Sequence, residues 1–148
     1  MARELQIRCG TTQANDLFIG AEGELTMDTT TKGLRIHDGQ TVGGFKIDTV
    51  VDFQVPTSSN NYTWYRKYSS GWVEQGGYKT SGAAGATTIT LPVEMASISF
   101  FPQVTRMGGS TSTTNIDVWA RQPTATTSFT AYTTSDTGIV WEVKGIAA

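Results

Sequence analysis

The sequence is poor in cysteine, histidine and charged residues, and it has no long apolar run. Of its 148 residues, one is cysteine, one is histidine and 16% are charged, whereas soluble domains average about 25% charged residues. The single cysteine, Cys9, excludes an intrachain disulfide. The apolar runs are far shorter than the roughly 18 residues that a membrane-spanning helix needs. The scarcity of charge also disfavours a helical bundle or coiled coil, because these are rich in Ala, Glu, Lys, Leu and Arg.

The charges that are present are balanced and scattered, and this excludes several partners. The formal net charge is -2, and Arg66-Lys67 is the only adjacent basic pair. The chain lacks the basic patch of nucleic-acid-binding domains and the polybasic segment that holds proteins on anionic membranes. Met1–Arg8 has no apolar signal-peptide core, and no phosphate-loop, dinucleotide-binding or zinc-ligand spacing occurs. We expect a chain made in a reducing cytoplasm, with no nucleic-acid partner, no membrane insertion and no cofactor.

What the sequence does have is threonine, serine and glycine in a repeated strand-and-turn pattern. Its 25 Thr, 11 Ser and 16 Gly supply the polar surface and the turns. Apolar and polar residues alternate with a period of two, as in half-buried strands, over residues 5–9, 34–37, 45–48, 51–55, 98–100, 116–119 and 139–144. Ser69-Ser70-Gly71 predicts a three-residue hairpin loop, and Gln13–Ile19 predicts one or two helical turns. The predicted fold class is all-β.

A change in composition near residues 56–61 predicts two parts. Residues 1–55 contain no Trp or Tyr, and so short a segment with few apolar side chains has a marginal core without staples or partners. Because no disulfide is available, we infer that partner chains stabilise it. Residues 56–148 hold all four Trp and suffice for a core of their own. The prediction is a small Gly-rich β-hairpin or stalk module at 1–55, followed by a β-sandwich tip at 56–148.

Two parts of the sequence resemble phage tail-fibre proteins. The first consists of three motifs whose order and spacing are similar to an attachment module of tail fibres and tail spikes: Leu5–Thr12, Ala21–Leu25 and Lys32–Thr41. Cys9 and His37 depart from that pattern, in which a polar residue and a glycine are usual. The second part, Trp64–Gly77, resembles the opening of a C-terminal tail-fibre domain, and Trp141–Gly145 resembles the final strand of that domain.

The resemblance implies a homotrimeric phage or prophage tail fibre. The chain would be a virion component, made in the host's bacterial cytoplasm, that contacts other tail or baseplate proteins. Its implied function is non-covalent recognition of the bacterial surface, through a glycan or an outer-membrane protein, with three weak sites acting by avidity. We expect no enzyme activity, because no pair of carboxylates stands out as a glycosidase centre and the chain is short for a polysaccharide-cleaving groove.

The candidate receptor-binding residues lie on or beside polar loops of the predicted tip. Such loops are expected at 107–115, 123–128 and 133–138, and binding residues concentrate on loops that a rigid scaffold carries. The alternative is that these loops are plain connections. Trp119 is out of phase with its apolar neighbours, which predicts that it faces outward, where it could stack on a sugar, or into a subunit interface. The candidates are Arg106, Trp119, Arg121, Tyr132 and Asp136.

The remaining aromatic and rare residues are assigned structural roles. Trp141 shares a strand face with its apolar second neighbours and is predicted to be core. Trp64 and Trp72 flank the hairpin loop and are expected to pair across it. Cys9 is predicted to be a small buried residue. His37 is expected at the surface beside a turn, since one histidine is no metal site. Three copies of it on a trimer axis, forming a metal-binding or pH-sensitive ring, are the less favoured alternative.

Two other functions stay open from the sequence. The chain could be a structural fibre or collar component that joins virion proteins without touching the host. It could also be a monomeric lectin-like domain. Binding to a tail protein but to no cells would indicate the first, and a monomeric mass would indicate the second.

Overall fold

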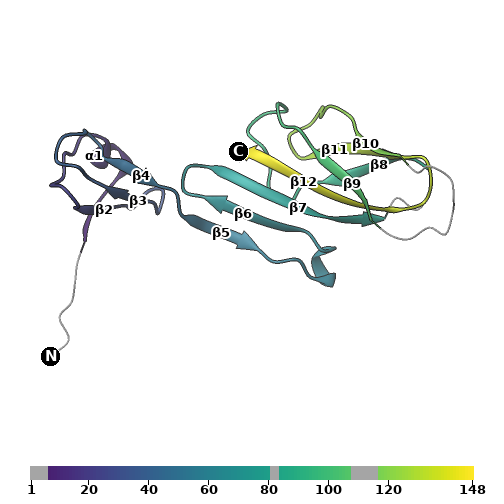
Figure 1. Cartoon of the computed structure of the whole chain (residues 1–148), viewed down its shortest axis with the longest axis horizontal. Helices are drawn as coiled ribbons and strands as arrows, with labels where there is room; N and C mark the ends of the chain where they lie inside the picture. The colour runs from purple at the N-terminus through teal and green to yellow at the C-terminus, as the bar shows by residue number, and fades with distance from the viewer. Residues whose placement is uncertain (1–6, 81–83, 108–116) are drawn as a thin grey trace. The chain divides into compact units, whose positions relative to one another are not determined.

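The computed structural model describes residues 7–80, 84–107 and 117–148. Over these ranges twelve β-strands are accompanied by one short α-helix and one short 3-10 helix (Figure 1), which confirms the all-β class. Leu5 and Ile116 of two predicted strands, and residues 108–115 of a predicted loop, lie outside the described residues. In the part of the chain that is described, no helix is long and apolar enough to cross a membrane.

The chain divides into two compact units. The first comprises residues up to Val51 together with Tyr68–Ser70, and the second comprises Asp52–Lys67 and Gly71–Ala148. The assignment of an attachment module to residues 1–55 and a tip to residues 56–148 stays a prediction.

The first unit is a four-stranded sheet with one helix. Its strands are hydrogen-bonded in the order β1 (Arg8–Gly10), β2 (Leu25–Asp28), β3 (Leu34–Ile36) and β4 (Phe45–Ile47). β1 is parallel to β2, and the other pairs are antiparallel. A parallel neighbour requires a crossover connection, and here it contains α1 (Thr12–Asp16), near the one or two turns expected from the sequence. The Thr11 side chain caps α1 by accepting a hydrogen bond from the Ala14 amide at 3.3 Å.

Burial in the first unit is the reverse of the usual arrangement. Its fully buried side chains, among the residues described, are polar or charged: Asn15, Thr26, Asp28, Arg35 and His37. Apolar residues alternate with them and point to the opposite face of the sheet. The register places these apolar residues in two rows: Leu25, Ile36 and Phe45 in one, and Cys9, Met27, Leu34 and Ile47 in the other. We call these seven residues the apolar face.

The second unit contains two sheets. The larger has the order β5 (Val50–Gln54), β6 (Trp64–Tyr68), β7 (Trp72–Thr80), β12 (Gly138–Ile146) and β9 (Gln103–Met107). The smaller has the order β10 (Val118–Ala120), β11 (Ser128–Thr133) and β8 (Gly85–Thr90), and its strands are antiparallel. The 3-10 helix, Ser58–Asn60, connects β5 to β6. The predicted loop Ser69-Ser70-Gly71 joins β6 to β7, and Gly71 supplies its positive φ of 86°.

One apolar core lies between these two sheets. The larger sheet contributes Val73, Ile139, Trp141 and Val143, and the smaller contributes Ile89, Phe129 and Ala131. Trp141 is 2% exposed and meets the Phe129 ring edge-on, with the ring centroids 5.9 Å apart. The prediction that Trp141 belongs to the core is therefore confirmed.

The connection between β8 and β9 corrects one predicted strand. Residues 98–100 form no strand, although their apolar residues alternate; Phe100 is buried and Ile98 is exposed. Side-chain and backbone hydrogen bonds hold the connection. The side-chain amide of the buried Gln75 donates to the Val93 carbonyl at 2.8 Å, and its side-chain carbonyl accepts from the Val93 amide at 2.9 Å. The Ala96 amide donates to the Ile146 carbonyl at 2.8 Å. Phe100 fills the core from a loop, so the period of two indicated burial but not a strand.

The expected pairing of Trp64 with Trp72 is wrong. The three-residue loop sets a register in which Trp64 lies opposite Gly76, and Trp72 lies opposite Ile146 of β12. The Trp64 indole covers Gly76 so closely that a Cβ there would come within 2.8 Å of the ring. Glycine at position 76 therefore makes room for the ring.

Candidate functional site

The structure brings three of the five predicted site residues to the outer face of the smaller sheet. Trp119 on β10 is paired in register with Tyr132 on β11, and their rings are stacked, with centroids 5.5 Å apart and planes 9° from parallel. Trp119 remains 47% exposed. Arg121 follows two residues later and is exposed; its amide donates to the Thr130 carbonyl at 2.9 Å. Strand alternation therefore places Trp119 and Arg121 on the same side.

Small side chains lie beside the two aromatic rings. The outward positions of β8 and β11 beside the two aromatic rings are Ala86, Thr88 and Thr130. Asp117 precedes Trp119 by two residues and is exposed, and its amide donates to the Thr134 hydroxyl at 3.0 Å. An exposed indole thus lies between a carboxylate and a guanidinium, each about 7 Å along the chain. We call Asp117, Trp119, Arg121 and Tyr132 the Trp–Tyr face.

Asp117 was missed as a site residue, although the sequence held the signal. The same alternation that turns Trp119 outward turns Asp117 and Arg121 outward with it. Side chains such as Thr88 and Thr130, by contrast, reach this face only through the pairing of β8 with β11, which the sequence does not specify.

The other two predicted site residues lie elsewhere. Arg106 is on β9, an edge strand of the larger sheet, opposite Ile139. It is half-buried, and its Nε is buried with no hydrogen-bond partner among the described residues. Asp136 is exposed in the connection from β11 to β12. Neither belongs to the Trp–Tyr face.

The predicted loops lie at both ends of the second unit. The register shows that β9 ends where β12 begins, and that β11 ends where β8 and β10 begin. Residues 133–138 and the strand ends that flank residues 108–116 are therefore at one end. Residues 123–127 are at the other end, where the Thr126 hydroxyl donates to the Glu94 carboxylate and its carbonyl accepts from the Met95 amide. Two hydrogen bonds therefore fix this loop to the connection between β8 and β9.

The apolar face of the first unit is exposed in the single chain. Phe45 is 54% exposed, and Leu25, Ile36, Ile47 and Cys9 are exposed as well. Soluble monomers rarely leave so contiguous an apolar patch open, and such patches mark surfaces that other chains cover. The prediction that Cys9 is buried within its own chain is wrong: the residue follows the alternation correctly, but its face is the open one.

Ion pairs and hydrogen bonds of charged side chains stabilise the buried face of the same sheet. Arg35 is 2% exposed; its guanidinium pairs with the Asp16 carboxylate at 2.7 Å and the Asp28 carboxylate at 3.2 Å, and donates to the Gly43 carbonyl at 3.1 Å. Burial alone would raise the pKa of Asp28, but hydrogen bonds from the Thr31 amide, the Thr12 hydroxyl, Arg35 and the Thr30 amide lower it to about 2. The carboxylate is therefore ionised and fully hydrogen-bonded inside the unit.

His37 belongs to this polar interior and is not a surface residue, as the sequence had suggested. It is 2% exposed; its Nδ1 accepts from the Gly20 amide at 3.2 Å, and its Nε2 is 3.0 Å from the Thr26 hydroxyl. The histidine is buried because its strand turns its polar residues inward. Both ring nitrogens are engaged within one chain, so the ring has no nitrogen left for an axial metal.

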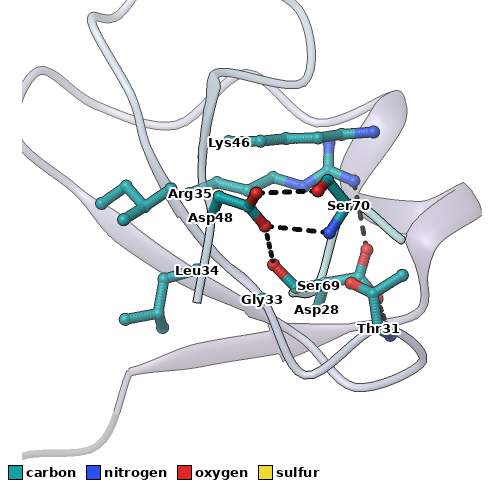
Figure 2. A pocket seen from close by; sticks show the side chains of 10 residues that line it. Asp28, Thr31, Gly33, Leu34, Arg35, Lys46, Asp48, Ser69 and Ser70 are labelled. Atoms are coloured by element: carbon teal, nitrogen blue, oxygen red, sulfur yellow. Dashed lines mark hydrogen bonds and ion pairs between the residues drawn. The ribbon is translucent and has the colours of Figure 1, made fainter. Parts of the chain in front are cut away.

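A cavity of about 310 Å³ lies at one end of the same sheet. Figure 2 shows Arg35 and Lys46 side by side along it, with Asp48 and Ser70 in front. Asp48 accepts hydrogen bonds from the Ser69 hydroxyl at 3.0 Å, the Ser70 amide at 2.9 Å and the Ser70 hydroxyl at 2.7 Å. Burial would raise the pKa of Asp48, but these three donors outweigh it and hold the pKa below its ordinary value.

Comparison with known proteins agrees with the resemblance seen in the sequence. Residues 5–41 match the family described as the major tropism determinant N-terminal domain. A tail fibre receptor-binding protein of Bordetella phage BPP-1 is 43% identical over 47 residues, which is 32% of this chain and 12% of that protein. The chain therefore spans only a small part of this relative's length.

Solved structures share the fold at low sequence identity. An N-truncated R2-type pyocin tail fibre superposes with a TM-score of 0.52 and 16% identity, covering 66% of this chain and 39% of that one. A C-terminal part of the R2 pyocin fibre of P. aeruginosa gives a TM-score of 0.51 and 16% identity, covering 66% of this chain and 26% of that one. The chain is thus similar in sequence to a phage receptor-binding protein over 47 residues, and similar in fold to tail fibres over 66% of its length. These findings confirm the resemblance to phage tail-fibre proteins.

Proposed function

We propose that the chain is a receptor-binding tail-fibre protein of a tailed phage or phage-like particle, whose second unit binds a glycan on the bacterial surface without cleaving it. The observation that carries this proposal is the Trp–Tyr face. An exposed indole packs against the apolar side of a sugar ring through the contacts that favour aromatic pairs. Asp117 and Arg121 flank Trp119, so one hydroxyl of a sugar chain can donate to the carboxylate while another accepts from the guanidinium.

The shape of this face favours a glycan over a protein. The strands beside the stack carry only small or hydroxyl side chains, such as Ala86 and Thr88. A shallow surface with one aromatic platform suits a sugar chain lying flat. A protein interface would be expected to contain a larger cluster of buried anchors. Binding at one such face is weak, and several copies on one particle make it effective through avidity.

We further propose that the first unit assembles three chains. The apolar face supports this, because a sheet whose apolar side is open gains stability only when another surface covers it. Three copies around one axis would cover three such faces together, as a closed symmetric oligomer requires. Light scattering coupled to size-exclusion chromatography tests this: a trimer gives three times the chain mass of 16.0 kDa, and a monomeric mass would favour the lectin-like alternative.

The binding proposal is tested with the labelled full chain on a panel of bacterial strains. Cells are treated beforehand with periodate, which oxidises sugars, or with protease, which removes exposed proteins. Binding that periodate abolishes and protease spares supports a glycan; the reverse pattern contradicts it and favours an outer-membrane protein. Binding to a tail protein and to no strain would indicate the structural virion component.

The face itself is tested with Trp119→Ala. Loss of the stack should weaken binding to cells about tenfold or more, since about 1.4 kcal/mol corresponds to each factor of ten. Phe101→Ala is the matched control: Phe101 is an 84% exposed aromatic residue of the same unit that is not on the Trp–Tyr face. Equal losses for both variants, or a loss only for Phe101→Ala, would remove the Trp–Tyr face as the binding site.

A further inference from the structure

The outward positions of the smaller sheet carry two charges of opposite sign, both on the line of β10. Alternation turns Asp117, Trp119 and Arg121 outward along this line, and both charged residues are exposed. The outward positions of β11 and β8 are uncharged: Ser128, Thr130, Tyr132, Ala86, Thr88 and Thr90. Charge is therefore concentrated on the two sides of the exposed indole.

Both charged side chains are available to a ligand. The hydrogen bonds at these residues use backbone groups, because the Asp117 amide donates to the Thr134 hydroxyl at 3.0 Å and the Arg121 amide donates to the Thr130 carbonyl at 2.9 Å. Among the described residues, neither the Asp117 carboxylate nor the Arg121 guanidinium forms an ion pair. The backbone is thus held extended while the charged groups stay in solvent.

The two charges act on a ligand separately. Four residues of extended chain, about 13 Å, separate the Cα atoms of Asp117 and Arg121, and the Debye length at physiological ionic strength is about 8 Å. A ligand lying along β10 over the indole therefore meets a negative charge on one side and a positive charge on the other. Covering either charge with a neutral group would remove water without replacing its hydrogen bonds. A ligand with a charge of each sign avoids this cost.

We propose that the Trp–Tyr face recognises a zwitterionic glycan, in which the ammonium group of an amino sugar pairs with Asp117 and the carboxylate of an acidic sugar pairs with Arg121. This rests on the glycan-binding function proposed above. A guanidinium can bind a carboxylate through two parallel hydrogen bonds, and its single charge balances the carboxylate, whereas a phosphate monoester carries nearly two charges. Thr130 and Thr88 lie in the same row as Arg121, and their hydroxyls can bond to those of the sugar.

The opposite signs also act against other glycans. A polyanionic chain brings a carboxylate to Asp117, and a polycationic chain brings an ammonium group to Arg121; like charges placed together weaken binding. Asp117 and Arg121 are thus the residues that determine specificity. Trp119 contributes affinity for a sugar ring of either charge, because stacking depends on the apolar side of the ring.

Four tetrasaccharides present every combination of the two charges. De-N-acetylated hyaluronan carries ammonium and carboxylate groups on alternating rings, hyaluronan carries only carboxylates, chitosan tetraose carries only ammonium groups, and N-acetylchitotetraose carries neither. In the alternating chain opposite charges occur on adjacent rings and on the two end rings, so more than one spacing is offered. Each is titrated into the full chain at a mildly acidic pH that keeps the sugar's amine protonated and its carboxylate ionised.

The reporter of binding is the indole N–H signal of Trp119 in the NMR spectrum, which is assigned by its loss in Trp119→Ala. De-N-acetylated hyaluronan should bind about fivefold more tightly than hyaluronan or chitosan tetraose, the upper range for one exposed ion pair. Asp117→Asn should abolish the preference over hyaluronan, and Arg121→Gln the preference over chitosan tetraose. Raising the salt to about 1 M, which shortens the Debye length to about 3 Å, should bring the four affinities together.

The matched controls are Glu22→Gln and Arg66→Gln. Both residues are exposed and lie outside the Trp–Tyr face, Glu22 in the first unit and Arg66 on β6 of the larger sheet. Each control removes the same charge as one of the test variants, so it corrects for the change in net charge. Both preferences should be unchanged in these two proteins.

Three results would overturn the proposal. If hyaluronan or chitosan tetraose bound as tightly as the zwitterionic chain, the face would recognise at most one sign of charge. If the preferences persisted in Asp117→Asn and Arg121→Gln, other residues would be responsible for them. If no tetrasaccharide moved the Trp119 signal, these charges would not recruit such a glycan. The cell assay with Trp119→Ala tests the proposed function independently, since periodate-sensitive binding that needs Trp119 is compatible with all three results.

Discussion

The two units solve the problem of burial in opposite ways. In the second unit apolar side chains from two sheets meet in one core, which includes Trp141. In the first unit the interior is an ion pair and its hydrogen bonds, around Arg35 and Asp28, and the apolar residues lie outside. Burial of apolar surface is the main force in folding and association. The second unit uses that force within one chain, and we infer that the first uses it between chains.

The largest expected effect comes from a charge on the apolar face. Ile36→Lys would place an unpaired ammonium in the proposed interface of every chain, at a cost of several kcal/mol each. We expect the mass by light scattering to fall from three chains to one. Leu17→Lys is the control, since Leu17 is 76% exposed and lies outside the sheet. An Ile36→Lys protein that keeps the mass of the parent would show that the apolar face is not an assembly surface.

The second-largest expected effect comes from removing the buried guanidinium of Arg35. Arg35→Ala leaves the Asp28 carboxylate inside the unit without its counter-charge, which should cost about 3–5 kcal/mol. Urea denaturation followed by amide signals of the first unit measures this. Arg8→Ala, which breaks the exposed ion pair with Glu24 at 3.0 Å, should cost under about 1 kcal/mol. Similar losses for both variants would mean that the buried pair is no more important than a surface one.

Acid should weaken the first unit before the second. The pKa of Asp28 is about 2 in the folded chain, against an ordinary value of 3.8 for the unfolded chain. Its contribution to stability is therefore complete above pH 3.8, declines as the pH falls below that value, and is lost once the pH passes below about 2. The full contribution is about 2 kcal/mol, at 1.36 kcal/mol for each pKa unit.

The two units can be followed separately during this titration. Tryptophan fluorescence reports the second unit, which holds all four Trp, and the Thr30 and Thr31 amide signals report the first. Asp28→Asn should lower stability at neutral pH and remove this part of the acid response. A second unit that unfolds at the higher pH would contradict the expected order.

The smallest effect on stability is expected at the Trp–Tyr face. Trp119→Ala removes an exposed stack and should cost about 0.5–1.5 kcal/mol, whereas Trp141→Ala empties the core and should cost about 3–5 kcal/mol. Thermal unfolding of the two variants measures the difference. Equal losses would mean that Trp119 is structural, and its effect on cell binding would then carry no information about the site.

Local sequence patterns predicted much of the second unit. Alternation placed Ile139, Trp141 and Val143 on the core side of β12, and the hairpin loop at residues 69–71 followed from its glycine. The prediction failed where the partner strand decides the outcome. Trp64 meets Gly76 and not Trp72, because register depends on loop geometry and on strands distant in the sequence.

In the candidate site, the outward direction of Trp119 and Arg121 followed from the period of two. That Tyr132 stacks on Trp119, while Arg106 lies on the other sheet, depended on which strands pair. Residues grouped by their nearness to loops are brought together only when their strands share a sheet. The sequence does not show which strands share a sheet, so it could not predict which of these residues lie together.

The sequence by itself determined the all-β class, the separation of a Trp-free first part from a Trp-rich second part, and the alternation within each strand. These depend on side-chain size, backbone preference and turn chemistry, which act over a few residues. In the first unit, only the tertiary structure decided which side of each strand is the inside. A period of two is symmetric between its faces, so Leu34 and Arg35 carry the same signal in either arrangement. The ion pairs with Asp16 and Asp28 stabilise Arg35 on the buried side of the sheet. Because neighbouring residues of a strand point to opposite sides, the apolar face is then exposed, and we infer that another surface covers it.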